Sequence, residues 1–299
     1  MRVLMCGLGD IARKAYLPVL ATMPGLELHL TTRNPEVLAE LGAAYRLKHL
    51  HFSLDAALAT TTFDAAFVHS ATTAHPEIVE RLLDRRIPTF VDKPLADNLG
   101  EAERLVQLAE ARSCLLTVGF NRRFAPDYAA LRPEHYPFIL MQKHRRAQPD
   151  LPRRVVFDDF IHVVDTLLFL TKAPSTRVTI ETLMDNGLLS GVTLMLGGSG
   201  HQAVGTMQRN SGLDEERIDL IGEGRKHAVV DLAERFDHDG AVTRHRRGDW
   251  TPVARQRGFD AMCADFLAGV KEGRSTAAHD ILETHRLCEA IVAHAEARD

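Results

Sequence analysis

The sequence has few cysteines, little net charge and no long hydrophobic run. Its four cysteines are scattered among 299 residues without a C-x-x-C pair, which argues against a disulfide framework or a cysteine-based metal site and favours the reducing cytoplasm. A formal net charge of −4 gives no general case for a nucleic-acid or membrane partner. No apolar run approaches the length of a membrane-spanning helix, and the N-terminus predicts a strand rather than a signal peptide.

The composition is that of a globular protein with room for two domains, at 45% hydrophobic and 25% charged residues. In the first 120 residues, predicted strands alternate with predicted helices, and this alternation is typical of a parallel, doubly wound sheet. The strands are expected at residues 3–6, 26–31, 63–70, 88–91 and 115–119, and the helices at residues 35–41, 76–85 and 99–111.

The pattern changes after about residue 136. One strongly apolar helix is expected at residues 155–170, and short β-like runs between Gly, Asn and Asp turns then predict a mostly antiparallel sheet. The runs are residues 138–143, 177–184, 188–196, 202–208, 217–221 and 228–232, and helices at 259–270 and 280–297 follow. We therefore predict an α/β protein with a Rossmann domain at residues 1–121. An α+β domain with an open sheet, for substrate binding and oligomerisation, is predicted at residues 122–299, and the cleft between the domains is the expected reaction site.

A glycine-rich turn directly follows the first predicted strand. Gly7 allows a tight turn, Gly9 lets a pyrophosphate approach without meeting a Cβ, and Ala12 is small enough for close packing of helix on strand. The N-terminus of the helix that follows offers free N–H groups to a phosphate. Because the turn opens a βαβ series, it predicts a dinucleotide site rather than a plain strand–turn–helix, and we assign that site Gly7, Leu8, Gly9, Asp10, Ile11 and Ala12.

The segment Asp92-Lys93-Pro94 lies at the carboxyl end of a predicted parallel strand, where open α/β sheets bind their ligands. A lysine there can donate a hydrogen bond to a substrate oxygen and polarise it. The alternative is a surface turn with a solvated lysine.

The apolar helix at residues 155–170 carries polar side chains at helical spacing. Asp158, His162 and Asp165 are four and three residues apart, which predicts one common stripe. Charges are costly to bury in such a helix unless they pair or face a wet cavity, and an aspartate one turn from a histidine orients the ring for general-base work. The alternatives are a structural Asp–His pair or a helix cap. Asp159 is expected to be a surface or structural residue, and no metal site is predicted because the sequence places no third ligand nearby.

The end of the second predicted strand bears on the choice of cofactor. An NAD enzyme needs an acidic residue there for the ribose 2′-hydroxyl, whereas this chain has Thr32 and Arg33 and no carboxylate before Glu36. A hydroxyl and a guanidinium suit a 2′-phosphate. NADP is therefore predicted, with NAD as the alternative if Arg33 is merely exposed.

A basic stretch leads into the apolar helix. It consists of Lys143, His144, Arg145, Arg146, Arg153 and Arg154, with Asp150 among them. These groups are expected either to rim the cleft and favour an anionic substrate, such as a sugar acid or phosphate, or to form a solvated face or an oligomer contact. A second basic run, at residues 244–247, is expected on an exposed hairpin.

Taken together, the glycine turn, Asp92-Lys93-Pro94, the segment at residues 119–124 and the pair Asp158 and His162 resemble the Gfo/Idh/MocA oxidoreductase family, above all its MviM-like branch of dehydrogenases. The resemblance spans nearly the whole chain. It implies a Rossmann domain, a C-terminal open sheet that often forms homodimers or homotetramers, and NAD(P)-dependent chemistry on sugars or polyols.

Carried over by position, Lys93 resembles the family's catalytic lysine, and Asp158 and His162 its Asp–His pair, with His162 the proton carrier. The positions that resemble its cofactor-binding loops are Ser70, Ala71, Thr72, His75, Asp92, Lys93, Asn121 and Arg122. Two departures are that Asp92 replaces the commoner glutamate and that Phe160 stands where a glycine often precedes the histidine. Neither departure removes a reacting group.

These observations predict an NADP-dependent oxidoreductase that transfers hydride between nicotinamide and a sugar- or polyol-like alcohol or carbonyl. One alternative is a glycosidase-like enzyme that uses bound NAD(P) as a recycling redox centre. The other is a regulatory protein that senses NADP(H) without turnover. The expected partner is a small molecule, with an anionic carbohydrate as one candidate, and not a nucleic acid or a membrane.

Overall fold

Parallel strands form the core of the first part of the chain. In the computed structural model, which describes residues 1–171 and 174–298, six strands make one parallel sheet in the order β3-β2-β1-β4-β5-β6. They are β1 (Arg2–Cys6), β2 (Glu27–Thr31), β3 (His49–His51), β4 (Ala65–Val68), β5 (Thr89–Asp92) and β6 (Leu116–Gly119). The strand order reverses between β1 and β4, and the carboxyl ends of strands at such a switch point are where this fold binds ligands. The predicted Rossmann architecture is confirmed.

Helical segments connect these strands, because parallel neighbours need a crossover connection rather than a tight hairpin turn. The helical segments are η1 (Ala12–Tyr16), α1 (Leu17–Leu20), α2 (Pro35–Ala44), α3 (Leu54–Thr60), η2 (Thr72–Ala74), α4 (His75–Asp84) and α5 (Leu99–Arg112). The Asn34 side chain caps α2 by accepting from the amides of Glu36 and Val37 at 3.0 and 3.1 Å, as predicted. Asn98 caps α5 in the same way.

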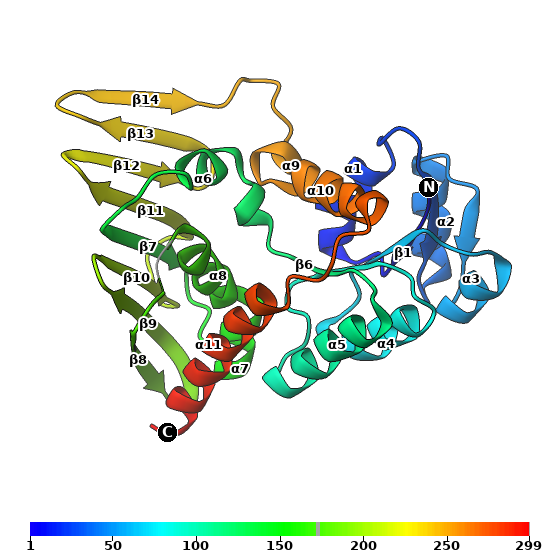
Figure 1. Ribbon diagram of the computed structural model, residues 1–299, viewed down its shortest axis with the longest axis horizontal. Coiled ribbons are helices and arrows are strands. Elements are labelled where there is room, and N and C mark those ends of the chain that lie inside the picture. Colours follow the sequence, from blue (N-terminus) through cyan, green and yellow to red (C-terminus); the bar gives the residue numbers. More distant parts are fainter. Residues whose placement is uncertain (172–173, 299) are drawn as a thin grey trace. The chain divides into compact units, whose positions relative to one another are not determined.

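Besides strand β3 and helix α3, which the sequence did not predict, two further features of this part differ from expectation. Helix α2 was expected to stop at Gly42 but continues to Ala44, because Gly42 is a packing position where an added Cβ would come within 2.6 Å of Leu50. The other feature is α10 (Phe259–Glu272), which packs against α1 although it lies far along the chain (Figure 1). The buried Phe266 ring of α10 lies edge-on to Phe67, with ring centroids 5.1 Å apart.

The second part of the chain forms an eight-stranded sheet in the order β14-β13-β12-β11-β7-β10-β9-β8. Its strands are β7 (Phe138–His144), β8 (Arg177–Asp185), β9 (Leu188–Gly198), β10 (His201–Gln208), β11 (Glu215–Gly222), β12 (Arg225–Val230), β13 (Glu234–His238) and β14 (Val242–Arg246). All neighbouring strands are antiparallel except β7 and β10, which run parallel. The mostly antiparallel sheet is thus confirmed.

A long helical stretch covers this sheet near β7 and β10 (Figure 1). It comprises α7 (Pro152–Val155), a π-helical turn η4 (Val156–Phe160) and α8 (Ile161–Leu170). It lies close to β10, because a Cβ added at Gly205 would be 2.4 Å from Val163. The other helices of the chain's second half are η3 (Asn121–Phe124), α6 (Pro126–Leu131), α9 (Val253–Gln256) and α11 (Ala278–Glu296).

By packing, the chain divides into one unit of Met1–Gly119 with Phe259–Leu282 and a second unit of Phe120–Gly258 with Glu283–Asp299. The predicted boundary between a domain of residues 1–121 and a domain of residues 122–299 remains a prediction.

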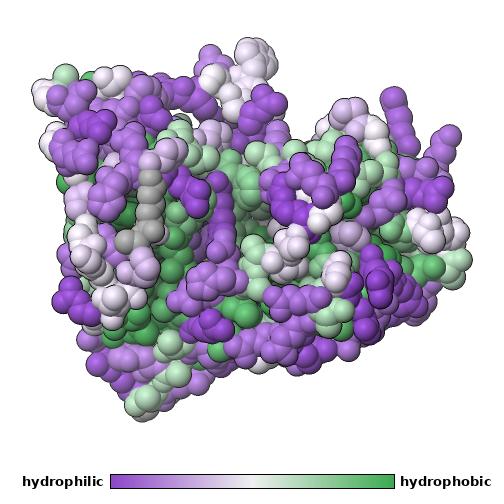
Figure 2. All heavy atoms as spheres, viewed as in Figure 1, coloured by the Kyte–Doolittle hydropathy of each residue, from purple (hydrophilic) through white to green (hydrophobic). Residues whose placement is uncertain are grey.

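The basic run at residues 244–247 begins on the exposed strand β14, as expected. The surface around β14 is mostly hydrophilic in Figure 2. No helix within residues 1–171 and 174–298 is long and apolar enough to cross a membrane.

Candidate active site

Gly7 makes the turn from β1 into the first helix. Its φ of +87° is one that L-residues rarely adopt, and an added Cβ would lie 2.5 Å from the backbone nitrogen of Ser70. Gly9 differs, because nothing lies within 4 Å of the position that its Cβ would take. The N–H groups of the first helical turn have no acceptor within the helix. The turn therefore combines a tight bend with an open approach for an anion.

The other residues of the predicted fingerprint divide into two kinds. Leu8 and Ala12 are buried and pack the turn against the sheet. Asp10 and Ile11 are exposed, and Asp10 forms an ion pair with Lys14 at 2.7 Å. The side chains of Asp10 and Ile11 therefore face solvent at the start of the helix.

The loop after β4 lies beside this turn. His75 is buried, and its two ring nitrogens lie 2.9 Å from the carbonyl oxygen of Ser70 and 2.8 Å from that of Pro94. It thereby links the loop after β4 to the loop after β5. Burial lowers the pKa of His75, and the two carbonyl contacts oppose that shift.

The hydroxyl of Ser70 is buried and has no hydrogen-bond partner among the described residues. An unsatisfied buried donor costs free energy unless a ligand supplies the partner. With the open space at Gly9, it makes this end of the sheet fit a dinucleotide, which Gly7, Gly9 and the loop from Ser70 to His75 would hold. Of that loop, Ala71 is exposed and Thr72 is partly exposed.

Lys93 follows β5 directly and is partly buried. Asp92, the last residue of β5, accepts a 2.6 Å hydrogen bond from the hydroxyl of Tyr16. Burial raises the pKa of Asp92, against the opposing effects of Lys93 and of that hydrogen bond. Tyr16 therefore anchors the residue next to the predicted catalytic lysine.

The end of β2 presents Thr32 and Arg33. The Thr32 hydroxyl is 3.4 Å from the amide of Asn34, and Arg33 is exposed. Glu36, the first carboxylate after this strand, is exposed in the first turn of α2.

The predicted stripe on the long helix is wrong in one member. Asp158 is exposed and His162 is partly exposed, whereas Asp165 is buried and forms an ion pair with Arg123 at 2.7 Å. His162 and Asp165 both lie in the regular helix α8, and because they are three residues apart on it, Asp165 lies further round the helix, on its buried side. Asp158 and His162 remain one turn apart, and Asp165 is structural.

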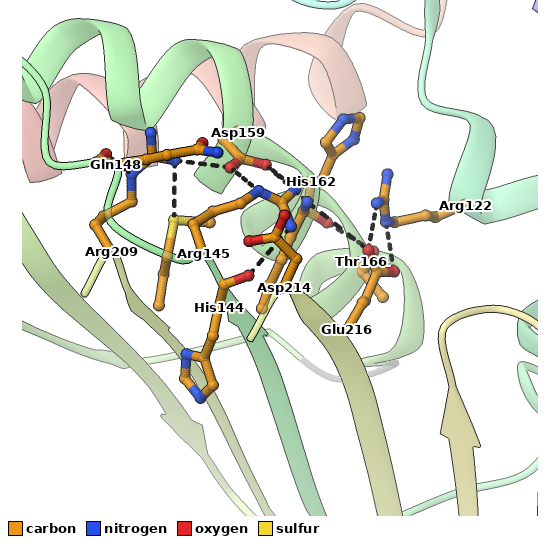
Figure 3. Close-up of polar contacts among 12 residues, drawn as sticks. Arg122, His144, Arg145, Gln148, Asp159, His162, Thr166, Arg209, Asp214 and Glu216 are labelled. Carbon is orange, nitrogen blue, oxygen red and sulfur yellow. Dashed lines mark hydrogen bonds and ion pairs between the residues drawn. The ribbon is translucent and has the colours of Figure 1, made fainter. Parts of the chain in front are cut away.

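Asp159, expected to be a surface or structural residue, is a structural ion-pair centre. Its carboxylate oxygens lie 2.8 Å from Arg145 and 2.8 Å from Arg209 (Figure 3). One of them also lies 2.7 Å from Nζ of Lys143. Burial alone would raise its pKa, but Lys143 and Arg145 lower it to about 2. Burial and repulsion from Arg122 lower the pKa of Lys143 to about 8, although Asp159 and Glu216 oppose this shift.

Arg122 is buried and its guanidinium forms a two-pronged ion pair with Glu216 (Figure 3). The neighbouring Asn121 is also buried and donates a 2.8 Å hydrogen bond to the carbonyl of Arg257. A cavity of about 380 Å³ opens beside these groups. Its walls include Arg122, Lys143, Arg145, Glu216 and Arg257.

Four of the six basic residues expected at a cleft rim form ion pairs, and Lys143 and Arg145 share one partner, Asp159. Arg153 pairs with Glu289 at 2.7 Å and Arg154 with Asp150 at 3.2 Å. Arg145 pairs with Asp159, as described above. His144 accepts a hydrogen bond from the amide of Gln208.

Comparison with known proteins identifies the fold and the family. A family model described as "Oxidoreductase family, NAD-binding Rossmann fold" (GFO_IDH_MocA) matches residues 1–120, and one described as "YceM-like, C-terminal domain" matches residues 126–238. YceM of Salmonella typhimurium, an oxidoreductase by name, is 32% identical over 301 residues, which cover 97% of each chain. This chain belongs to the Gfo/Idh/MocA oxidoreductase family.

Two further relatives are similar to this Gfo/Idh/MocA oxidoreductase. The crystal structure of the dehydrogenase MviM from Clostridium difficile has a TM-score of 0.92 at 28% identity and covers 98% of this chain and 99% of its own. The myo-inositol dehydrogenase Hyg17 of Streptomyces leeuwenhoekii is 33% identical over 174 residues, which cover 54% of this chain and 51% of its own. The predicted resemblance to the family and to MviM is confirmed, as is the prediction of an NAD(P)-binding oxidoreductase.

Within this family member, the predicted catalytic residues belong to different units. Lys93 is in the first unit, and Asp158 and His162 are in the second. The first unit collects the glycine turn, the loop from Ser70 to His75 and Lys93 at the carboxyl ends of neighbouring strands. The second holds an exposed aspartate one turn from a histidine, a pattern suited to moving a proton.

Sequence reasoning did not find Tyr16 or Glu216 as site residues, and it placed Lys143 in the basic stretch without its carboxylate partners. For Lys143 a signal was present, because Ile139, Met141 and Lys143 alternate along β7 and share its buried face. A lysine at a buried strand position requires a carboxylate partner. For Tyr16 and Glu216 the partners are 76 and 94 residues away, so the local sequence carries no signal.

Proposed function

We propose that this protein is an NADP-dependent dehydrogenase or reductase that acts on an alcohol or carbonyl of a sugar- or polyol-like substrate. The observation that carries the proposal is the set of groups at the carboxyl ends of β1, β4 and β5. There the open space at Gly9, the unsatisfied hydroxyl of Ser70 and the lysine after β5 occur in one sheet. Membership of an oxidoreductase family supports it.

The proposed residue roles follow from their chemistry. In the oxidative direction, His162 takes the proton of the substrate hydroxyl, and Lys93 donates a hydrogen bond to the same oxygen and stabilises its developing charge. Asp158, one helical turn from His162, orients the imidazole. The bound nicotinamide supplies the hydride acceptor at its C4 atom.

NADP is proposed over NAD because Arg33 is exposed at the end of β2 and Glu36 is the first carboxylate beyond it. A guanidinium there can bind a 2′-phosphate with charge-assisted hydrogen bonds. Replacing Arg33 by Asp should weaken NADP binding and favour NAD. An unchanged ratio of the two dissociation constants would remove Arg33 from cofactor selection.

A polyol or sugar substrate is supported by the similarity to Hyg17, whose name gives myo-inositol as its substrate. The cavity beside Arg122 is walled by four cations and four carboxylates, so its charge does not by itself favour an anionic substituent such as that of a sugar acid. The cations are Arg122, Lys143, Arg145 and Arg257, and the carboxylates are Asp214, Glu215, Glu216 and Asp231.

The two alternatives predict different behaviour. An enzyme that recycles its bound nucleotide would turn over substrate without net consumption of free cofactor. A sensor would bind NADP(H) and turn over nothing. The presence of Lys93, Asp158 and His162 favours an enzyme, since a sensor needs none of them.

The deciding experiment replaces Lys93 by Met. The variant should bind NADPH within about twofold of the wild type, while turnover on any substrate found in a panel of sugars, polyols and sugar acids falls by about 10²–10⁴. Lys271→Met, at an exposed position on α10, is the matched control and should retain full turnover. Undiminished turnover by Lys93→Met would exclude the lysine from the mechanism.

A homodimer or homotetramer is also proposed. The eight-stranded sheet leaves large apolar side chains exposed, among them Val178 and Leu183 of β8, at 48% and 57%, and such side chains favour an interface. Light scattering should give a mass of two or four chains. A monomer at micromolar concentration would contradict the proposal.

A further inference from the structure

A second cluster of reactive side chains lies on the first unit, away from the cofactor site. Glu27 and His29 are on β2 and His49 is on the neighbouring strand β3, where His29 and His49 are paired in register. Glu27 and His49 are the first residues of their strands, whereas the glycine turn and Lys93 follow the carboxyl ends of β1 and β5. One ligand atom from each of the three residues lies within 4.8 Å of the other two.

The donor set selects a class of ion. Two imidazoles and one carboxylate suit zinc, copper, nickel and cobalt, whereas calcium and magnesium prefer sites made entirely of oxygen. Zinc is known to bind to two histidines and a glutamate, with its fourth coordination position open to water or a substrate. The set is accessible from solution because Glu27 and His49 are exposed, although His29 is buried.

Supporting contacts hold the central ligand in place. Nδ1 of His29 lies 3.0 Å from Nε2 of His51, and Nε2 of His29 lies 3.0 Å from a carboxylate oxygen of Glu27. The Phe63 ring packs edge-on against His29, with centroids 5.0 Å apart. Metal-binding histidines commonly bond through their other ring nitrogen to a partner that fixes the tautomer, and His51 stands where that partner is needed. Because His51 occupies Nδ1 of His29, the other ring nitrogen of His29, Nε2, is the atom that can bind an ion, and it faces Glu27.

Closing on an ion requires the two exposed ligand side chains, His49 and Glu27, to adjust. The rings of His29 and His49 are stacked, with centroids 4.2 Å apart and planes inclined by 13°, so their lone pairs do not yet converge. Tilting the exposed His49 ring brings its nitrogen toward Nε2 of His29, and Glu27 has to give up its 3.6 Å ion pair with Arg2. These adjustments predict weaker binding than a preformed structural site gives.

We propose that Glu27, His29 and His49 bind one divalent transition-metal ion of the zinc class, with His51 as the positioning residue for His29. The ion would join β2 to the three-residue edge strand β3. This inference departs from the expectation of no metal site, and it does not depend on the proposed reaction.

The test uses the full chain, purified without a polyhistidine tag and treated with a chelator that is then removed. Titration with Zn²⁺ in a calorimeter should show one saturable site, and the melting temperature should rise with Zn²⁺ because binding to the folded state stabilises it. Mg²⁺ at the same concentrations should neither bind nor stabilise.

Variants locate the site. His49→Ala and Glu27→Gln change exposed side chains, so they should fold normally by circular dichroism and weaken Zn²⁺ binding at least tenfold. His51→Gln should weaken it by about 10–100-fold, the range for loss of a supporting contact to a ligand. His135→Ala, an exposed histidine of the second unit, is the control and should bind as the wild type does. The absence of saturable binding, or wild-type affinity in His49→Ala, would overturn the proposal.

Discussion

At the scale of single residues, Gly7 determines the shape of the turn after β1 in the first unit, and Asp159 holds together a group of cations in the second unit. Gly7 combines a positive φ with a backbone atom of Ser70 where its Cβ would lie, so any side chain there displaces the loop after β4. Asp159 is the common partner of three cations, so its loss leaves several positive charges close together. The chemistry of both positions leads to measurable predictions.

Gly7→Ala should weaken NADPH binding at least tenfold, roughly 1.4 kcal/mol, because the turn and the Ser70 loop have to separate. Gly25→Ala is a matched control, since Gly25 also has a positive φ, of +77°, but nothing lies within 4 Å of its added Cβ. The control should lose about 1 kcal/mol of stability from backbone strain and keep its cofactor affinity. Equal affinities for the two variants, measured by fluorescence titration, would contradict the account of the turn.

Asp159→Asn should lower the free energy of unfolding at neutral pH by about 3–5 kcal/mol, because buried cations lose their partner. The folded-state pKa of Asp159 is about 2, below its ordinary value. Its stabilisation is therefore complete above pH ~4 and is lost as the pH falls toward 2, a loss of about 2 kcal/mol.

Denaturant titrations between neutral and acid pH measure this difference. The wild type should lose about 2 kcal/mol more than Asp159→Asn as the pH falls through that window. Asp249→Asn, at an exposed position, should keep the wild-type pH dependence. If the wild type and Asp159→Asn lose stability in parallel, the ion-pair centre is not the source.

At the scale of helices and strands, local patterns predicted most elements. Asn34 with Pro35, and Asn98, marked helix starts because a capping side chain acts within its own turn. Strand β3 was missed because three residues are too few for an alternating pattern to emerge. The π-helical turn η4 was not predicted either, and the burial of Asp165 against Arg123 depends on a contact 42 residues away in the chain.

The positions of candidate site residues were predictable where they depend on local geometry. The glycine turn and Lys93 are examples, because both are fixed by where a strand ends. The network of Arg122, Lys143 and Glu216 was not predictable, since its contacts join distant strands and loops. The packing of α10 on the first unit belongs to the same class, because it depends on tertiary contacts of Phe266.

Phe266→Ala should lower the free energy of unfolding by about 3–5 kcal/mol, the usual cost of a large cavity in a core. The ring is 1% exposed and packs against Phe67 and Phe90. Phe52→Ala, at a residue that is 64% exposed, should change stability by less than about 0.5 kcal/mol. If both variants unfold at the same denaturant concentration, α10 is not part of the first unit's core.

At the scale of the whole molecule, the proposed mechanism joins two units. In that proposal, Lys93 and the glycine turn of the first unit act together with His162 and Asp158 of the second unit. Neither unit has the full set, so the proposal requires groups from both units at one substrate carbon–oxygen bond.

The most direct measurement is a crystal structure of the protein with NADP⁺ and a substrate identified by screening. The account predicts that Nζ of Lys93 and a ring nitrogen of His162 both lie about 3 Å from the same substrate oxygen, on the side of the nicotinamide that carries hydride. A complex in which either group is separated from that oxygen by more than about two hydrogen-bond lengths, or faces away from it, would contradict the proposed mechanism.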